Sequence, residues 1–384
     1  MNSLNAQSQD SLIHYLINEI KINFALDKRT SLFNIEVKNN NGDILISGEV
    51  DNPKLKNELE KILLNNNVKY LDEIKVLPDE KLNGKNYGIV TVSVGNLRTN
   101  PNHSAEMASQ ALLGTPVKVL KYEDGFYLVQ TPDNYIAWID DEGIELMSKE
   151  NFDSYINSKK IIFTSEFGFA FQSIEKNSAH VSDLVRGNIL QLIDEEKNFF
   201  QVKFPDGRTG YIKKDDAIDF EVWLETREPS SKNILSEAFN MLGIPYLWGG
   251  TSYKGIDCSG FTKTVYFLNG ILLSRDASQQ VNLGIDVDTK SGFDNLQSGD
   301  LLFFGKKADE NHKEKITHVG IYIGALNYIH ESGKVKVNSF DEKSPLFSRH
   351  RLNQFVRAKR IITSINQNGV EFIKNNKFYR GEIE

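Results

Sequence analysis

The chain contains one cysteine, Cys258, at a position where the sequence predicts the start of a helix. It is the second residue of the run Asp-Cys-Ser-Gly-Phe at 257–261, just after a glycine-rich turn at 249–251. Apolar residues recur at helical spacing from 261 to 268, so the sulfur should lie near the positive end of the helix. A helix start favours thiolate over thiol, and the thiolate is the reactive form of cysteine. We therefore expect Cys258 to be a nucleophile.

Two histidines fall in a predicted β-hairpin later in the chain. The segments 318–323 and 328–332 alternate apolar with small or polar residues on either side of a turn. If Gly320 pairs with His330, then His318 and His330 are diagonal cross-strand neighbours, with Cα atoms ~7–8 Å apart. The two imidazole rings should then line up on one face of the hairpin.

Nucleophilic catalysis by cysteine needs a base and a third group that orients the base, and Cys258, His318 and His330 can fill these three positions. Taken singly, a cysteine is usually a small buried hydrophobe and a strand histidine is usually structural. The combination of all three favours catalysis. A Cys-His-His zinc site is the competing interpretation, but the spacing is poor for zinc. We expect no metal and no other cofactor.

Motifs around these residues resemble the NlpC-type cysteine peptidases of bacteria, and their order and spacing match that family from about residue 233 to 362. They are Pro245-Tyr246-Leu247-Trp248-Gly249-Gly250, the 257–261 run, Arg275-Asp276, Gly299-Asp300 with the apolar residues that follow, the 318–323 strand and Ile329-His330. The resemblance implies a papain-like domain that cleaves peptidoglycan stem peptides with a Cys258, His318 and His330 triad. It also implies that Tyr246 helps to stabilise the oxyanion, although an aromatic residue before this turn could equally serve packing.

The composition is that of a multidomain globular protein. Its 384 residues are 40% hydrophobic, and 45 Lys and Arg against 52 Asp and Glu give a net charge of −7. No apolar run approaches the ~18 residues of a membrane span, and no basic stripe suggests nucleic acid as a partner. Residues 1–10 lack a secretory signal pattern, so we expect a cytoplasmic protein, or a periplasmic or cell-envelope one if a signal peptide was removed. The oligomeric state has no signature in the sequence.

The middle of the chain contains a duplicated module. Nine positions between Gly114 and Ile139 have the same or a similar residue 73 positions later, between Gly187 and Ile212, without a gap. Each copy has short alternating segments joined by Asp-Gly, Pro-Asp or Asp-Asn turns, which predicts a small β-barrel. The closing aromatic dipeptides resemble those of bacterial SH3-like domains. We expect two such barrels, at 87–148 and 155–222.

The segment 98–114 of the first barrel resembles that of one NlpC-type subgroup, the γ-D-glutamyl-L-diamino-acid endopeptidases. In that subgroup the barrel closes one end of the cleft, and the substrate has a free N-terminal L-alanine. A buried ammonium group needs carboxylates and hydroxyls around it, because its desolvation is otherwise prohibitive. The resemblance assigns this role to Glu106, Tyr135 and Asp276. The alternative is that Glu106 is a surface charge and Asp276 a helix cap.

Three residues beside the predicted nucleophile are further candidates for substrate binding. Asp257 and Ser259 could supply hydrogen bonds in the cleft, and Trp248 could form an apolar wall. Asp and Ser are also common helix caps, so simple helix-start chemistry is the alternative for both. Ala277 stands where some relatives have a hydroxyl residue, which leaves room for a different substrate preference.

Residues 1–82 are predicted to form another small α+β domain. Two amphipathic helices flank two alternating strands, and the pattern weakly resembles the BON domains of bacterial envelope proteins. No residue there suggests chemistry, so we expect a binding or positioning role. The catalytic domain should span 230–363, and the polar segment 364–384 should be an appended tail.

The sequence thus predicts an α+β protein in which a papain-like catalytic domain follows two SH3-like barrels and a small α+β domain. We expect a cysteine endopeptidase that hydrolyses the γ-D-glutamyl to L-diamino-acid bond, with lysine or diaminopimelate as the diamino acid. Peptidoglycan-derived peptides are its expected partners. An amidase or acyltransferase with the same triad, and a peptidoglycan-binding scaffold, are the alternatives.

Overall fold

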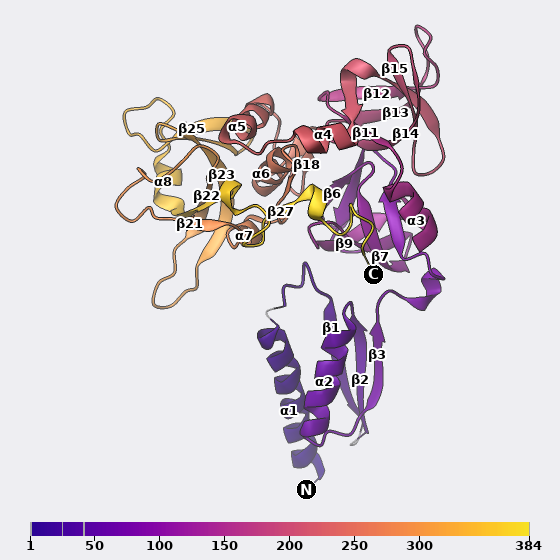
Figure 1. Ribbon diagram of the computed structural model, residues 1–384. Coiled ribbons are helices and arrows are strands. Elements are labelled where there is room, and N and C mark those ends of the chain that lie inside the picture. Colours follow the sequence, from indigo (N-terminus) through magenta and orange to yellow (C-terminus); the bar gives the residue numbers. More distant parts are fainter. Residues whose placement is uncertain (1, 25, 41–42, 384) are drawn as a thin grey trace.

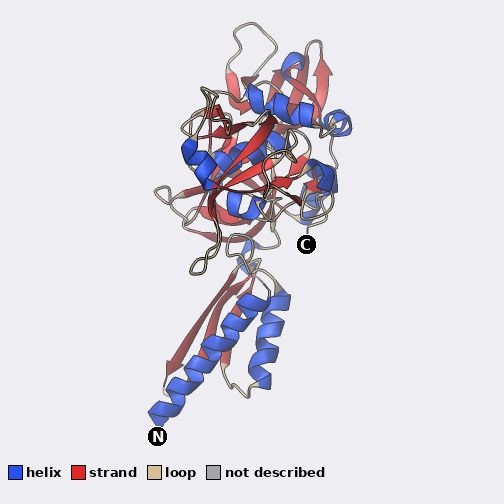
Figure 2. Ribbon diagram, turned by 90° about the vertical axis from the view of Figure 1, so that its left-hand side faces the viewer, coloured by secondary structure: helices blue, strands red, loops and turns tan. Residues whose placement is uncertain are grey.

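A computed structural model describes residues 2–24, 26–40 and 43–383 of the chain. Three β-rich units cluster together, and a fourth, N-terminal unit projects from the cluster in both views (Figures 1 and 2). Within the described ranges, no helix has the length and apolar character required to cross a bilayer.

The N-terminal unit is a three-stranded sheet with two helices packed on it (Figure 2). Its elements are α1 (Asn2–Asn23), β1 (Phe33–Asn40), β2 (Asp43–Val50), α2 (Pro53–Asn65) and β3 (Leu71–Val76). Strands β1 and β2 form an antiparallel pair, while β2 and β3 are parallel because α2 carries the chain back across the sheet. The core takes one helical stripe from each helix, including Ile13 and Ile17 of α1 and Leu55 and Leu59 of α2. The predicted helices and strands are confirmed here.

Two seven-stranded sheets follow, and their topology is the same. The first has strands β4 (Tyr87–Val90), β5 (Val94–Arg98), β6 (Met107–Leu112), β7 (Pro116–Glu123), β8 (Phe126–Gln130), β9 (Ile136–Asp140) and β10 (Ile144–Met147). The second has β11 (Lys160–Phe163), β12 (Phe167–Phe171), β13 (His180–Val185), β14 (Ile189–Glu196), β15 (Phe199–Lys203), β16 (Thr209–Lys213) and β17 (Ala217–Asp219). We call them the first and second SH3-like units.

The two units have the same strand order and the same strand register, as the sequence duplication predicts. The orders are β10-β4-β7-β8-β9-β5-β6 and β17-β11-β14-β15-β16-β12-β13, which correspond strand by strand. Phe126 pairs with Asp140, and Phe199 pairs with Lys213, 73 residues further on in each strand. The duplicated module is therefore confirmed as a duplicated sheet. Between the two units lies the helix α3 (Lys149–Ile156), and α4 (Phe220–Thr226) follows the second unit.

The catalytic unit has a six-stranded antiparallel sheet in the order β21-β26-β22-β23-β24-β25, with helices packed against it. The strands are β21 (Ile285–Val287), β22 (Leu301–Lys306), β23 (Lys315–Gly324), β24 (Asn327–Glu331), β25 (Val335–Ser339) and β26 (Phe355–Arg360). The helices are α5 (Ser231–Asn240), α6 (Cys258–Phe267), α7 (Ala277–Gln280) and α8 (Arg349–Gln354). Short two-stranded pairs join β18 (Thr251–Ser252) to β19 (Gly255–Ile256), and β20 (Ile271–Leu272) to β27 (Glu371–Phe372).

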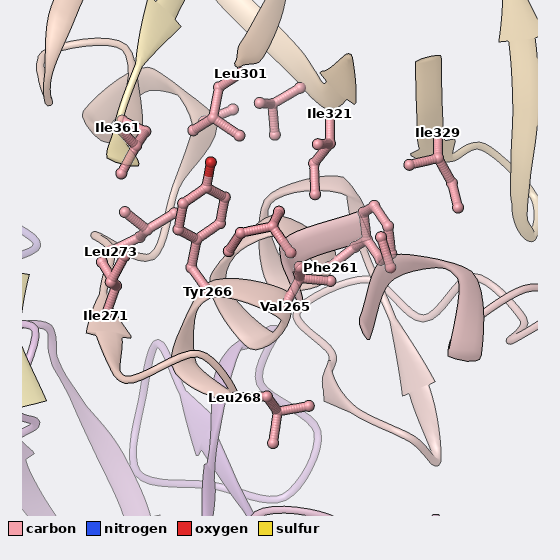
Figure 3. Close-up of a cluster of buried hydrophobic side chains, with 14 of the residues drawn as sticks. Phe261, Val265, Tyr266, Leu268, Ile271, Leu273, Leu301, Ile321, Ile329 and Ile361 are labelled. Carbon is pink, nitrogen blue, oxygen red and sulfur yellow. The ribbon is translucent and has the colours of Figure 1, made fainter. Parts of the chain in front are cut away.

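Helix α6 is held on this sheet by its apolar face. Phe261 and Val265 point toward Ile321 of β23 and Ile329 of β24 in the core (Figure 3). All four side chains are fully buried. This packing fixes the beginning of α6 beside the middle of the β23–β24 hairpin, because a buried helix cannot slide without opening cavities.

The C-terminal segment is not the polar appendage that the sequence predicted. Phe372 forms part of the β20–β27 pair, and Phe378 and Ile383 are buried in a cluster with Tyr87 of the first SH3-like unit. Asn376 donates its side-chain N–H to the Pro132 carbonyl oxygen at 3.1 Å. The few apolar residues of this segment are widely spaced among polar ones, so its average composition hid its role in joining two units.

Candidate active site

Cys258 is the first residue of α6, and Asp257 is the N-cap of that helix. The Asp257 carboxylate accepts hydrogen bonds from the backbone N–H groups of Gly260 at 2.7 Å and Gly249 at 2.9 Å. A Cβ on Gly260 would lie 2.0 Å from the Gly250 carbonyl oxygen, so only glycine lets the helix approach the turn this closely. The sequence Asp-Cys-Ser-Gly thereby sets the position of the sulfur.

The β23–β24 hairpin has the register predicted from the sequence, with Gly320 opposite His330. The two histidines meet, and His318 Nε2 lies 2.7 Å from His330 Nδ1. His330 Nε2 in turn lies 2.8 Å from the Asn338 side-chain oxygen on β25. Sequence reasoning missed Asn338, which is opposite Tyr328 and is therefore a diagonal cross-strand neighbour of His330. Predicting the pairing of β24 with β25 would have revealed it.

This relay fixes which nitrogen of each ring carries a proton. Asn338 donates its N–H to the Leu346 carbonyl oxygen, so its own oxygen must accept from His330 Nε2. His330 Nδ1 is then an acceptor, and His318 Nε2–H donates its hydrogen bond to it. The remaining nitrogen of His318, Nδ1, carries no proton and keeps its lone pair. An unprotonated nitrogen is what a general base needs.

Cys258 and His318 line one cavity of about 900 Å³. A backbone hydrogen bond from Val319, the neighbour of His318, reaches the Cys258 sulfur and favours the thiolate. His330 lies behind His318 and is 1% exposed, so its position is that of an orienting group and not of a group that meets substrate. The structure thus brings the three predicted catalytic residues together.

The expectation that the helix start gives a resting thiolate is not met. Burial, and after it the negative charge of Asp257, raise the pKa of Cys258 to about 11. Burial, and then the positive charge of Arg351, hold the pKa of His318 well below its ordinary value of 6.5. The resting pair is therefore a thiol and a neutral imidazole, and the thiolate has to be formed by proton transfer to His318.

Asp257 and Ser259, predicted as candidates for substrate binding, line the same cavity as Cys258, but their polar atoms are engaged within the protein. The Asp257 carboxylate pairs with the Arg275 guanidinium at 2.5 Å, and Arg275 also donates to the Ser259 hydroxyl oxygen at 3.0 Å. All three side chains are buried and engaged with one another. These contacts hold the start of α6, in agreement with the helix-cap alternative, and a role in substrate binding stays a prediction. Arg275 was recognised only as part of a motif, because a buried ion pair has no local sequence signature.

The other predicted residues surround the same cavity, which is lined by Glu106, Tyr135, Tyr246, Trp248 and Asp276. Trp248 donates its indole N–H to the Glu106 carboxylate at 2.7 Å, which joins the catalytic unit to the first SH3-like unit. Burial is the main cause that raises the pKa of Tyr246 to about 12, so its hydroxyl keeps its proton and can donate a hydrogen bond. The cavity thus has a reacting end at Cys258 and a wall built by the first SH3-like unit.

A residue of the N-terminal unit also reaches this cavity. Arg29 donates to the Asp276 carboxylate at 2.8 Å, and Lys28 and Arg29 both line the cavity. Asp276 is also the N-cap of α7 and forms a capping box with Gln279. The helix-cap alternative is therefore correct for Asp276, which in addition pairs with Arg29. Nothing in the sequence around Arg29 indicated this contact.

The zinc alternative is not favoured by the donor atoms. Both ring nitrogens of His330 are taken up by His318 and Asn338, so this ring has no lone pair to offer a metal. Across the part of the chain that is described, no group of three His, Cys, Asp or Glu side chains is arranged to hold a metal ion.

A cysteine at a helix start, with a histidine oriented by a second polar group, defines the class of cysteine hydrolases. Comparison with known proteins agrees with this class. The profile of the NlpC/P60 family matches residues 243–355, and that of the bacterial dipeptidyl-peptidase SH3 domain matches residues 97–144. A γ-D-glutamyl-L-lysine dipeptidyl-peptidase of Bacillus cereus is 30% identical over 273 residues, which are 69% of this chain and 77% of that protein. The chain belongs to the NlpC/P60 family of cysteine peptidases.

Two further relatives support the assignment. Dipeptidyl-peptidase 6 of Lysinibacillus sphaericus is 29% identical over 269 residues, which are 67% of this chain and 93% of that protein. The crystal structure of an NlpC/P60 family protein from Bacillus cereus superposes with a TM-score of 0.61 at 23% identity, over 72% of this chain and 99% of that one. The predicted fold, a papain-like unit with SH3-like units, is thereby confirmed. The likeness of residues 1–82 to BON domains stays a prediction.

Proposed function

We propose that the protein hydrolyses the γ-D-glutamyl to L-diamino-acid bond of peptidoglycan stem peptides that begin with a free L-alanine. The observation that carries this proposal is the placement of two carboxylates, Glu106 from the first SH3-like unit and Asp276 from the catalytic unit, in the cavity that contains Cys258 and His318. An ammonium group leaves water only where such carboxylates receive it. Relatives named as γ-D-glutamyl-L-lysine dipeptidyl-peptidase and as dipeptidyl-peptidase 6 support the same substrate class.

The chemistry is acyl transfer from the peptide to water through a thioester. His318 Nδ1 takes the thiol proton as the Cys258 sulfur attacks the scissile carbonyl carbon. The carbonyl oxygen becomes an oxyanion, and the backbone N–H groups at the start of α6, with the Tyr246 hydroxyl, are the donors available to it. The imidazolium then protonates the leaving amine, the C–N bond breaks, and the acyl group remains on sulfur. Water, deprotonated by neutral His318, releases the acid and restores the thiol.

The first test is product analysis with two matched pairs of peptides. L-Alanyl-γ-D-glutamyl-diaminopimelate, its lysine analogue and the N-acetylated form of each are incubated with the wild type and with Cys258→Ser, and products are identified by mass spectrometry. We expect L-alanyl-D-glutamate from the free peptides only, and none from the serine variant. Cleavage of another bond, or transfer to an added amine, would instead assign an amidase or acyltransferase reaction to the same triad.

The amine-recognition part has its own test. Glu106→Gln keeps the shape of the side chain and its bond to the Trp248 indole N–H, but it removes one negative charge from the cavity. We expect this variant to lose about 10-fold in kcat/KM on free peptides and to gain nothing on acetylated ones. Glu142→Gln, at an exposed glutamate of the same unit, is the matched control and should behave like the wild type. Equal discrimination in both variants would remove Glu106 from the recognition site.

A further inference from the structure

The loop at residues 26–32 joins α1 to β1 and is seated on the first SH3-like unit. Ile136 of β9 donates its backbone N–H to the Arg29 carbonyl oxygen at 2.7 Å. Leu32 packs against a buried cluster that contains Leu77 and Trp138. A second contact, between Lys121 and Glu49 at 2.7 Å, ties the same two units together away from the loop. The loop is therefore held at the cavity by contacts that do not involve the catalytic unit.

The side chain of Arg29 then crosses to the catalytic unit. One terminal nitrogen donates to Asp276 at 2.8 Å and to the Ser278 hydroxyl at 2.9 Å. The rest of the guanidinium is held by Asp27, at 2.6 Å from the other terminal nitrogen and 2.9 Å from Nε. Gln279 also donates to Asp27 at 3.0 Å. Arg29 of the N-terminal unit thus forms an ion pair with Asp276, one of the two carboxylates proposed to bind the substrate's ammonium group.

We propose that Arg29 is a specificity-determining residue that competes with the substrate's ammonium group for Asp276. This inference rests on the proposed function, because it concerns the amine end of the same cavity. Without the guanidinium, Asp276 and Glu106 would face a cationic substrate with two negative charges. With it, the charge of Asp276 is already offset, and the incoming ammonium group has to displace Arg29 or rely on Glu106.

Displacement is feasible because Arg29 has a second carboxylate partner. The side chains of Arg29 and Asp276 are 30% and 29% exposed, so the guanidinium can move away without crossing a packed core. Asp27 lies on the same loop and keeps its bonds to the guanidinium when Asp276 is released. The guanidinium therefore keeps a carboxylate partner whether or not it is bound to Asp276, so its displacement leaves no buried charge without a partner.

The competing role and a strut differ in what they do to substrate binding. A strut that holds Asp276 in place would, when removed, weaken binding of free-amine peptides. A competitor would, when removed, strengthen it. Binding of N-acetylated peptides should not respond in either case, because these peptides bring no cation to Asp276.

The test measures kcat and KM for the free-amine tripeptide, and binding of the N-acetylated tripeptide as its inhibition constant against the free one, with four full-length proteins: wild type, Arg29→Gln, Arg29→Lys and Glu49→Gln. We expect Arg29→Gln to lower KM for the free peptide about 5-fold, a typical size for coupling between two binding events. Arg29→Lys should stay near the wild type because it keeps a cation in the loop. Glu49→Gln is the matched control, since it breaks the other ion pair between the same units without touching the cavity.

The outcomes separate the two proposals. If the wild type cleaves neither peptide, the proposed function fails, and the role of Arg29 fails with it. If the wild type cleaves the free peptide but Arg29→Gln leaves KM unchanged or raises it, the proposed function holds and the competing role is overturned. The same 5-fold decrease in Glu49→Gln would also overturn it, because loosening of the interface would then explain the effect.

Discussion

Glu331, the residue after the orienting histidine, is a buried carboxylic acid whose removal should stabilise the protein at high pH. Its side chain is fully buried, and neither of its oxygens has a hydrogen-bond partner within the described part of the chain. Burial, and then the negative charge of Asp257, raise the pKa of Glu331 from 4.5 to about 7. The folded protein therefore binds a proton here that the unfolded chain gives up.

The sign and size of the effect follow from this pKa. Because the folded value is above the unfolded one, the folded state loses stability as pH rises from about 4.5 through about 7, and the loss is complete above that range. A difference of roughly 2.5 pKa units corresponds to about 3.4 kcal/mol without screening, and because Glu331 lines the solvent-filled cavity we expect about 1–2 kcal/mol. Glutamine has the same shape and cannot ionise, so Glu331→Gln should equal the wild type near pH 4.5 and exceed it by up to that amount at about pH 8.

Hydrogen exchange measures the stability difference between the two proteins within the catalytic unit. A single global unfolding transition would not, because the units of a multidomain chain can unfold separately. Exchange of peptides from α6 and β24 is compared between wild type and Glu331→Gln at the same pH, at about pH 5 and about pH 8. Glu310→Gln, at an exposed glutamate of the same unit, is the control and should show no difference at either pH. A protection difference that does not change with pH, or that favours the wild type at high pH, would refute the reasoning.

Three more substitutions test how the site is built. Gly260→Ala places a Cβ 2.0 Å from the Gly250 carbonyl oxygen, so we expect a loss of about 1–3 kcal/mol in the stability of the catalytic unit, measured by hydrogen exchange of α6, together with loss of activity. Arg275→Met leaves the N-cap carboxylate of α6 buried without its cation and should cost about 3–5 kcal/mol in the same assay, with little protein left folded at 37 °C. Asn338→Leu removes the acceptor of His330 Nε2–H, so kcat should fall by about 10- to 100-fold while the melting temperature changes little.

The parts that the sequence predicted are those that depend on local pattern. The register of the β23–β24 hairpin follows from alternation and turn position, and it places His318 and His330 on one face. The duplication follows from identical spacing in two stretches, and strand pairing repeats that spacing. The helix start at Cys258 follows from the cap and the glycines before it. In each case the information lies in the order and spacing of residues within short stretches of the chain.

The parts that the sequence did not predict depend on how separate segments dock. Arg29 and Asp276 are 247 residues apart, and neither has a neighbour that points to the other. Phe378 is one of a few apolar residues in a polar C-terminal segment, yet it is fully buried against the first SH3-like unit. The charge balance around Asp257 also depends on a distant partner, Arg275. Such contacts are set by the geometry of the whole chain and leave no periodic signal.

The resting state of the catalytic pair bears on how the reaction begins. Burial raises the pKa of the Cys258 thiol, so the resting thiolate is disfavoured and the nucleophile has to be formed by proton transfer. The proton is transferred to His318 Nδ1, and the ion pair so formed has the Val319 backbone N–H and the start of α6 beside its negative end. Its positive end, the His318 imidazolium, donates to His330 Nδ1, and His330 Nε2–H donates to the Asn338 side-chain oxygen. The relay therefore stabilises a charge separation that exists only during turnover, which is where stabilisation raises the rate.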